Sequence, residues 1–311
     1  MRHTITVVGA GNVGGSAAHA CLMRGLGDVV LLDINEKIPR GKALDLSQAA
    51  VLEGHGCIVT GSSEYDDTAH SDIVVVTAGV PRKPGMSRDD LIMVNADIVG
   101  QIIQKTLKYS PHAVFIIAAN PVDVMCMAAH RAGIDDTRRI IGLSGVLDTA
   151  RLRAETARAA NVPGRAVQGL VIGEHGDGMV PLPRLSQVAG LPAGLLLTGE
   201  QTEQACSNAV FGGARIMEYL GSSAYYAPGA ALAVMAEAVL RDKGDILPCS
   251  AYLNGEYGID GIFMCVPVRL GLRGVENIIV LDLSDEEKDA VARSAAGIRA
   301  KTASLPAAKR T

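Results

Sequence analysis

A glycine-rich turn directly after the first apolar run constrains the fold of this chain more than any other feature. The stretch "TITVVGAGNVG" places Gly9, Gly11 and Gly14 in the spacing G-x-G-x-x-G, and Asp33 ends the next apolar run. In this pattern the first glycine permits a tight turn, the second lets the backbone approach a pyrophosphate, and the third lets a helix pack on the strand. The glycines alone are a weak signal. The strand before them and the acid after them make it a strong one.

Asp33 indicates which dinucleotide this turn would bind. A carboxylate there accepts hydrogen bonds from both ribose hydroxyls and repels a 2′-phosphate, and no arginine follows it directly, so NAD is favoured over NADP. The alternative is that Asp33 caps a helix or lies in a solvated turn. The cofactor contacts predicted in this segment are Val8, Gly9, Ala10, Gly11, Asn12, Val13, Gly14 and Asp33.

Short β-rich runs alternate with helical patterns through the first half of the chain. Because the runs are apolar throughout, they suit a parallel sheet that helices cover on both faces. Two of them, "ITVVGAG" and "DIVVVTAG", resemble each other, as the two halves of a doubly wound sheet would. We therefore predict an α/β Rossmann domain. Its strands are expected at residues 4–9, 28–33, 57–61, 72–79, 113–120 and 139–143.

The pattern changes after about residue 143. The second half predicts helices, short strands and a Gly-rich antiparallel region, with Asn254-Gly255 as a hairpin turn. We expect two domains, a Rossmann domain at 1–143 and an α+β substrate-binding domain at 144–311. Ser284, with Glu287 three residues on, predicts a capped last helix, and the tail from residue 303 is expected to be frayed. The other elements expected here are helices at 147–161, 200–219 and 229–241 and strands around 165–172.

Composition excludes several classes of protein. The net charge of −4 provides no basic surface for nucleic acid or an anionic membrane, and no apolar run approaches the ~18 residues that span a bilayer. The six cysteines show neither CxxC nor a zinc-ligand spacing, so we expect no metal site and free thiols in a reducing compartment. The first strand-like run begins too early for a signal peptide. These observations predict a soluble, cytoplasmic protein.

A Pro/Gly-rich loop with two arginines follows the fourth expected strand. In "AGVPRKPGMSRDDL", Ser87 and Asp90 have the spacing of a helix N-cap with its capping box, which puts Arg88 in the first helical turn. Arg82 lies in the loop before it. A solvated basic loop is the simpler interpretation of both arginines. Against it, the loop leaves the carboxyl end of a central strand, where doubly wound sheets bind ligands.

Three further segments carry residues with possible chemistry, each with an ordinary explanation. In "LDTAR", Asp148 and Arg151 lie on one helical face, where an exposed ion pair is the default. In "AANPVDV", Asn120 ends the fifth strand, where an asparagine before proline normally makes a turn. In "GEHGDGMVPLPR", His175 lies between two acids, yet a lone histidine is more often structural than catalytic.

Taken together and in order, "GAGNVG", "AGVPRKPGMSR", "AANPVDV", "LDTAR" and "GEHGD" resemble the lactate/malate dehydrogenase family over nearly the whole chain. The resemblance implies a hydride transfer between NAD and the C2 carbon of a 2-hydroxy acid. It implies that His175 is the proton donor and acceptor, that Asp148 orients it, and that Arg151 grips the C1 carboxylate. Histidine titrates near neutrality, and a guanidinium matches a carboxylate bidentately, as these roles require. The other implied residues are Arg88 at the reacting carbonyl, Asn120 at substrate and cofactor, and Asn95, Ala118 and Ala119 at the cofactor.

Arg82 indicates the branch of the family. Lactate dehydrogenases carry glutamine at this position, whereas malate dehydrogenases carry an arginine for the second carboxylate. The small residues of "SSAYYAPG" are also typical of the malate branch. The resemblance therefore implies a dicarboxylate substrate (malate or oxaloacetate), a step of the tricarboxylic acid cycle, and a homo-oligomer that is either a dimer or a tetramer.

Two alternatives stay open at this point. One is a lactate or other 2-hydroxyacid dehydrogenase, against which Arg82 argues. The other is a catalytically silent NAD-binding sensor or scaffold, which would keep "GAGNVG" and Asp33. Such a protein would have no reason to keep His175, Asp148 and three arginines in register.

Overall fold

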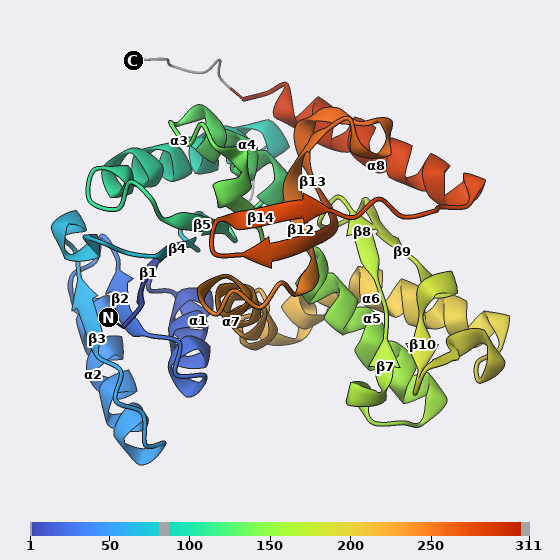
Figure 1. The fold of residues 1–311 in the computed structure, drawn as a ribbon, viewed down its shortest axis with the longest axis horizontal. Coiled ribbons are helices and arrows are strands. Elements are labelled where there is room, and N and C mark those ends of the chain that lie inside the picture. The colour runs from blue at the N-terminus through green and yellow to red at the C-terminus, as the bar shows by residue number, and fades with distance from the viewer. Residues whose placement is uncertain (1, 81–86, 306–311) are drawn as a thin grey trace.

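The computed structural model describes residues 2–80 and 87–305, except the side chain of Arg88. Its centre is a long sheet with helices on both faces (Figure 1). The parallel part has the strand order β3-β2-β1-β4-β5-β6, which is the order of a doubly wound sheet. These strands are β1 (Thr4–Val8), β2 (Asp28–Leu32), β3 (Val59–Ser62), β4 (Ile73–Val76), β5 (Val114–Ile117) and β6 (Ile140–Gly142).

The register of the central strands brings their carboxyl ends together. Val8, the last residue of β1, pairs with Leu32 of β2 and with Val76 of β4. The segments that follow these three strands therefore leave the sheet side by side, which is where a doubly wound sheet binds its ligands.

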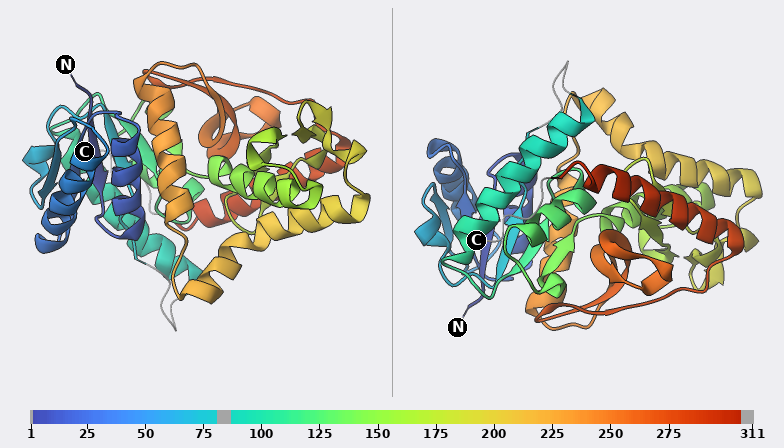
Figure 2. Two further views of the ribbon diagram at one scale, coloured as in Figure 1. Left: turned by 90° about the horizontal axis from the view of Figure 1, so that it is seen from below. Right: turned by 90° about the horizontal axis from the view of Figure 1, so that it is seen from above.

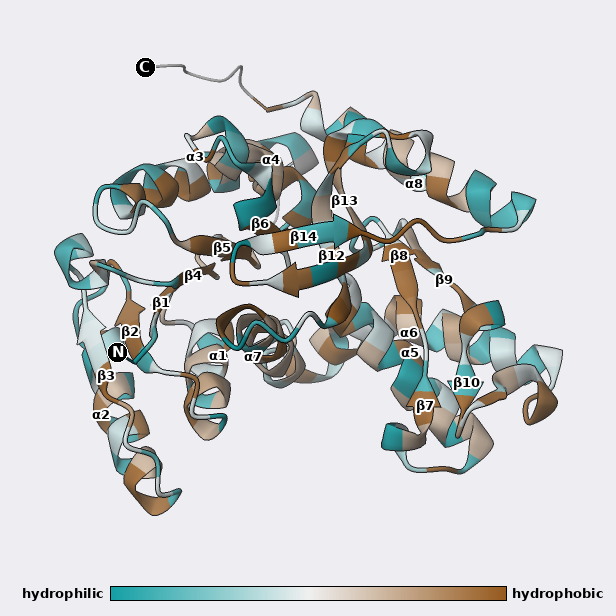
Figure 3. Cartoon of the chain, viewed as in Figure 1, coloured by the Kyte–Doolittle hydropathy of each residue, from teal (hydrophilic) through white to brown (hydrophobic). Residues whose placement is uncertain are grey.

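Side chains that alternate along each strand fill two separate cores. In β4, Ile73 and Val75 pack with helices α1 and α7, whereas Val74 and Val76 pack with α3 and α4 on the other face. Both faces are covered, so strands such as β2 and β5 are apolar almost throughout (Figure 3). The helices around the parallel strands are α1 (Asn12–Met23), α2 (Lys37–Leu52), α3 (Arg88–Leu107), α4 (Val122–Arg131) and α7 (Tyr226–Leu240).

Beyond β6 the same sheet continues with antiparallel strands. Ser250 of β12 pairs with Gly142 of β6, and β12 forms a long hairpin with β13, which in turn pairs with β8 and β14. The predicted fold class, a Rossmann sheet followed by an α+β part, is confirmed. The remaining strands and helices are β8 (Val171–Gly173), β9 (Met179–Pro181), β12 (Ile246–Asn254), β13 (Asp260–Gly271), β14 (Gly274–Ile278), α5 (Gly145–Ala160), α6 (Gly199–Leu220) and α8 (Asp285–Thr302). A small second sheet joins β7 (Val167–Gln168), β10 (Gln187–Val188) and β11 (Leu191–Pro192).

Helix α7 joins the two parts of the chain. It lies beside α1, as the left view of Figure 2 shows, and a Cβ added at Gly229 would be 2.6 Å from the Cβ of Ser16. A larger residue at position 229 would separate the helices. This contact places a helix from the second half of the sequence on the core of the first half.

Two expectations for the second half were wrong in detail. The β12–β13 hairpin does not close with a two-residue Asn254-Gly255 turn, because a 3₁₀ helix (Glu256–Gly258) follows and lengthens the connection. The tail is not frayed from residue 303, since Leu305 is 7% exposed and packs in the core beside α4. Within residues 2–80 and 87–305, no helix has both the length and the apolar character that crossing a bilayer requires.

Candidate active site

The turn after β1 is tightly packed against its neighbours. Gly9 has a φ of 103°, and a Cβ added there would lie 2.8 Å from the backbone nitrogen of Ala78. A Cβ at Gly14 would lie 1.8 Å from the carbonyl oxygen of Gly9. At Gly11, by contrast, no heavy atom of the described residues comes within 4 Å of an added Cβ. The first and third glycines are therefore required by the protein's own backbone, and the second leaves open space.

A cavity of about 510 Å³ opens beside this turn. Val8, Gly9, Gly11 and Asp33 line it, whereas the other residues predicted from the turn (Ala10, Asn12, Val13 and Gly14) are not among its lining residues. The rest of the lining comes from the segments after β2, β3 and β4 and from α3, including Ser63, Thr77, Gly79 and Ile98.

Both carboxylate oxygens of Asp33 accept hydrogen bonds from the backbone beside this cavity. Its Oδ2 accepts the backbone N–H of Ala10 at 2.7 Å, and its Oδ1 accepts that of Asn35 at 3.0 Å. Ile34, which follows it, is 99% exposed. The carboxylate thus lies at the carboxyl end of β2, and the next residue in the sequence is apolar.

Sequence reasoning missed Lys42, a cation next to the turn. Its Nζ donates to the carbonyl oxygen of Gly11 at 2.8 Å from helix α2. Burial lowers the pKa of Lys42, and the charge of Asp33 opposes that effect. Spacing gave no signal for it, because Lys42 is one of several basic residues on an exposed helix.

Asn95 connects two segments at the carboxyl edge of the sheet. It is buried in α3, its Oδ1 accepts the N–H of Val80 at 2.8 Å, and its Nδ2 donates to the carbonyl of Asn120 at 2.9 Å. Asn120 itself is exposed at the end of the segment that follows β5. Of the two predicted cofactor residues before it, Ala118 is half-buried and Ala119 is buried.

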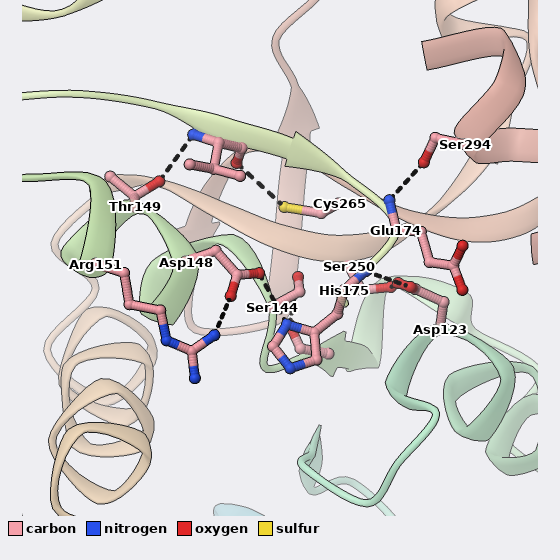
Figure 4. A network of polar contacts seen from close by, with 12 residues as sticks. Asp123, Ser144, Asp148, Thr149, Arg151, Glu174, His175, Ser250, Cys265 and Ser294 are labelled. Atoms are coloured by element: carbon pink, nitrogen blue, oxygen red, sulfur yellow. Dashed lines mark hydrogen bonds and ion pairs between the residues drawn. The ribbon is translucent and has the colours of Figure 1, made fainter. Parts of the chain in front are cut away.

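His175, Asp148 and Arg151 form one hydrogen-bonded cluster (Figure 4). The Nδ1 of His175 lies 2.8 Å from Oδ2 of Asp148, and Nη1 of Arg151 donates to the other oxygen, Oδ1, at 3.0 Å. Asp148 is 1% exposed, while about a sixth of each partner's side chain is open. The structure therefore brings His175 together with Asp148 and Arg151, which the sequence placed in a separate segment.

Local structure explains these positions. Asp148 lies in the first turn of α5, where the helix N-terminus favours a negative charge, and Arg151 follows on the same face. His175 follows β8 after Gly173, whose φ of 85° turns the chain at the end of the strand. Beside Arg151, α6 carries Gly213, where an added Cβ would be 3.2 Å from Nη2 of the guanidinium.

The environment of His175 favours its charged form. Burial lowers the pKa of the imidazole, but the charge of Asp148 and its hydrogen bond raise it. Asp123 raises this pKa further and Arg151 lowers it, and the net pKa lies above the usual value of 6.5. At neutral pH the imidazole therefore has a larger protonated fraction than an exposed histidine.

Sequence reasoning also missed a second buried carboxylate beside this cluster. Asp123 is 2% exposed in the first turn of α4 and accepts the backbone N–H of His175. On the other side of the loop, the N–H of Glu174 is donated to Ser294 of α8. The available signal was the acid itself, since Asp123 interrupts an otherwise apolar helix in "NPVDVMCM".

The loop with the two further predicted arginines is only partly described. Arg82 lies outside the described residues, as does the side chain of Arg88. The capping box of α3 is confirmed, because Ser87 Oγ accepts the N–H of Asp90 and the Asp90 carboxylate accepts that of Ser87. Elsewhere in the described part of the chain, no group of three or more His, Cys, Asp or Glu residues is arranged to hold a metal ion.

Comparison with known proteins identifies the family. Residues 3–142 match the family model described as lactate/malate dehydrogenase, NAD binding domain, and residues 145–307 match lactate/malate dehydrogenase, alpha/beta C-terminal domain. The chain is 48% identical over 299 residues to a malate dehydrogenase of Desulforudis audaxviator, which covers 96% of this chain and 97% of that protein.

Solved structures agree with this result. The malate dehydrogenase of Salinibacter ruber is 41% identical, with a TM-score of 0.93 and 97% of each chain covered. The lactate dehydrogenase of Cryptosporidium parvum, solved with lactic acid and nicotinamide adenine dinucleotide, is 36% identical with a TM-score of 0.93, covering 97% of this chain and 98% of that one. Both halves of the chain match, and the identities extend over almost its full length. The protein belongs to the lactate/malate dehydrogenase family.

Proposed function

We propose that this protein is a malate dehydrogenase that catalyses the reversible, NAD-dependent oxidation of (S)-malate to oxaloacetate, a reaction of the tricarboxylic acid cycle. The observation that carries the proposal is the hydrogen-bonded cluster of His175, Asp148 and Arg151 in a chain of this family. Support for malate over lactate comes from Arg82 in the sequence and from curated relatives that are named malate dehydrogenase.

His175 acts as the proton donor when oxaloacetate is reduced. Asp148 accepts a hydrogen bond from Nδ1–H, which leaves Nε2 to face the substrate oxygen. As negative charge develops on that oxygen, the Nε2 proton moves to it, and in the reverse direction Nε2 takes the proton of the malate hydroxyl. The Asp148 carboxylate stabilises the imidazolium.

The arginines bind and polarise the substrate. Asp148 engages Nη1 of Arg151, so the Nε–Nη2 edge of the guanidinium is available to grip the C1 carboxylate bidentately. Arg82 binds the second carboxylate and Arg88 polarises the C2 carbonyl. Asn120 donates a hydrogen bond to the substrate from the end of β5.

The cavity beside the turn fits NAD. Bound there, the nicotinamide supplies the hydride that adds to the C2 carbonyl. The open space at Gly11 admits the pyrophosphate, and Asp33 at the end of β2 accepts from the ribose hydroxyls. We assign Val8 to Gly14, Asp33, Asn95, Ala118, Ala119 and Asn120 to the NAD site, and of these Val8, Gly9, Gly11 and Asp33 line the cavity. Asn95 acts through its hydrogen bonds to the backbone of Val80 and Asn120.

We divide the chain into an NAD-binding domain at 1–143 and a substrate-binding domain at 144–311, which agrees closely with the limits of the two family models. We also propose a homo-oligomer, either a dimer or a tetramer. Exposed apolar side chains on the outer helices support it, notably Leu44 and Leu52 of α2 and Phe211 of α6. All six cysteines, which lie within the described ranges, are free thiols, as expected in the reducing cytoplasm.

The test of substrate choice compares oxaloacetate with pyruvate. Wild-type protein should oxidise NADH far faster with oxaloacetate. Arg82→Gln leaves a desolvated carboxylate without its partner, a loss that typically costs about 2–5 kcal/mol, or roughly 30- to several-thousand-fold in kcat/KM. Pyruvate has a methyl group in place of that carboxylate, so its kcat/KM should hold steady or rise.

Arg88→Gln is the matched control, because it acts at the carbonyl that both substrates share. It should lower kcat/KM for both alike. If Arg82→Gln also lowered the two values in parallel, Arg82 would not discriminate between the substrates and the malate assignment would be wrong.

A further inference from the structure

A second buried carboxylate holds the backbone of the proton carrier. Asp123 Oδ2 accepts the backbone N–H of His175 at 3.0 Å, and Oδ1 accepts the hydroxyl of Ser250 at 2.6 Å (Figure 4). The side chain is almost completely buried, with 2% of the residue exposed. No lysine, arginine or histidine of the described residues forms an ion pair with it within 4.0 Å.

Such a carboxylate is costly to keep in a protein interior. Burial raises the pKa of Asp123 to about 6, against hydrogen bonds from Ser250 and His175 that lower it. A buried acid without a cationic partner normally costs several kcal/mol unless hydrogen bonds compensate it. The hydrogen bonds from Ser250 and His175 to Asp123 are of that kind, and His175 is the residue that carries the reacting proton.

The loop around His175 needs such an anchor. Gly173 and Gly176, on either side of it, have φ values of 85° and 116°, and glycine allows the backbone more conformations than other residues do. The bond between Nδ1 and Asp148 orients the imidazole correctly only if the Cα of His175 is fixed. A displacement of about 1 Å at a reacting group can lower the rate by about 10²-fold.

We propose that Asp123 is a positioning residue of this active site, which fixes the peptide nitrogen of His175 so that Asp148 can orient the ring. The inference rests on the proposed role of His175 as proton carrier. Asp123 acts from α4 and Asp148 from α5, so the loop is held by its backbone from one helix and by its side chain from the other. Asp123 bonds to the backbone of His175, whereas the imidazole bonds to Asp148, so we do not assign Asp123 a part in the proton transfer.

Three substitutions separate the anchor from the charge. In Asp123→Asn, the amide oxygen can still accept the His175 N–H, while the amide nitrogen donates to Ser250 Oγ, so the anchor stays and the charge is lost. Asp123→Ala and the nearly isosteric Asp123→Leu both remove the anchor. We expect kcat for oxaloacetate reduction to fall by ~10²-fold or more in Ala and Leu and by less than about 10-fold in Asn. NADH affinity, measured by fluorescence, should stay within about threefold of wild type.

Thr149→Val is the matched control. Thr149 Oγ1 accepts the backbone N–H of Val171 at 2.9 Å in a buried position, so the control removes a bond of the same kind from the strand that leads to His175. It should lower the thermal midpoint to a similar extent as Asp123→Ala but change kcat by less than about threefold. Equal losses of kcat in Thr149→Val and Asp123→Ala, or in Asp123→Asn and Asp123→Ala, would overturn the proposal.

Hydrogen exchange tests the anchor without any activity measurement. In the wild type the amide of His175 should be protected well beyond that of an exposed loop, and the protection should persist in Asp123→Asn. Rapid exchange of this amide in the wild-type protein would overturn the proposal, even if no Ala or Leu variant folded. Absence of oxaloacetate reduction in a wild type with a protected amide would instead refute the proposed function and leave the anchor in place.

Discussion

The turn after β1 and the cluster around His175 are built in opposite ways. The turn comes from one continuous stretch, and its shape depends on backbone atoms that approach too closely for a side chain, as at Gly9 and Gly14. The cluster joins elements that are distant in sequence: the hydrogen bond between His175 and Asp148 spans 27 positions, and Asp123 beside the cluster accepts from Ser250 across 127 positions. The turn is therefore specified by missing side chains, and the cluster by side chains that tertiary packing brings together.

The largest effect should come from the cluster. His175→Asn removes the group that carries the proton, so turnover with oxaloacetate should fall by ~10²- to 10⁴-fold, the range of general acid–base catalysis. Because the turn is untouched, NADH affinity should stay near the wild-type value. Steady-state kinetics and NADH fluorescence titration measure the two quantities. Near-normal turnover would mean that another group supplies the proton.

Substitutions in the turn after β1 should change the stability of the protein and its affinity for NADH. In Gly14→Ala the new Cβ would overlap the carbonyl oxygen of Gly9, and overpacking of this kind costs about 1–3 kcal/mol or more. The thermal midpoint and NADH affinity should both fall, the affinity by roughly tenfold or more.

Gly11→Ala tests the same turn without that strain. No heavy atom of the described residues lies near its added Cβ, so the thermal midpoint should match the wild type while NADH binding weakens. A loss of stability as large as that of Gly14→Ala would show that the open space at Gly11 serves the fold and not the cofactor.

The pH profile of the reaction should depend on the charge of Asp148. Oxaloacetate reduction needs protonated His175, so kcat/KM at saturating NADH should fall as pH rises through a pKa above 6.5. Malate oxidation needs the neutral ring and should show the opposite slope. Asp148→Asn removes the charge that raises this pKa, so the midpoint should move to lower pH.

The free energy of unfolding should also depend on pH through the raised pKa of His175. A raised pKa in the folded state stabilises the protein below the unfolded pKa of histidine, and this contribution is lost as pH rises through the folded value. Asp148→Asn should therefore lose more stability at acidic than at alkaline pH. An unchanged midpoint in the kinetic profile would show that Asp148 does not govern the proton carrier.

The smallest effect concerns a glycine that faces a side chain. In Gly213→Ala the added Cβ would be 3.2 Å from Nη2 of Arg151, a contact that a small shift of the guanidinium relieves. We expect KM for oxaloacetate to rise by about three- to tenfold. Stability should not fall, since alanine is favoured over glycine in helices by about 1 kcal/mol.

Gly199→Ala, in the same helix, is the control. Nothing among the described residues lies within 4 Å of its added Cβ, so KM should not change. An unchanged KM in Gly213→Ala would place the substrate away from Arg151.

The parallel half of the fold was predictable because its strands are apolar on both faces. Strands β1, β2 and β4 all lie within the expected ranges. Because helices cover both faces of the sheet, each of these strands is a nearly continuous apolar run in the sequence. The β12–β13 hairpin was harder, because Asn254-Gly255 indicates a tight turn and the chain adds a 3₁₀ helix there. Local turn chemistry does not report the length of a connection.

The residues of the candidate site also differ in how far the local sequence predicts them. Asp33 follows a strand at a fixed spacing, so one stretch of sequence was sufficient to find it. His175, Asp148 and Arg151 were found through the joint resemblance of their segments, because each has an ordinary local explanation. Asp123 and Lys42 were missed, since their importance depends on contacts with the backbone of His175 and Gly11.

The continuous sheet has a consequence for exchanging parts between relatives. Ile5 of β1 and Val268 of β13 belong to one apolar core, which α1 and α7 cover together. A chimera cut near residue 143 would join a cofactor half and a substrate half whose buried surfaces had evolved with different partners. Most such hybrids should fail to fold, because α7 would pack poorly against an α1 from a different relative. Exchanging α7 together with the first 143 residues should restore expression, because the seam would then leave the α1–α7 contact intact.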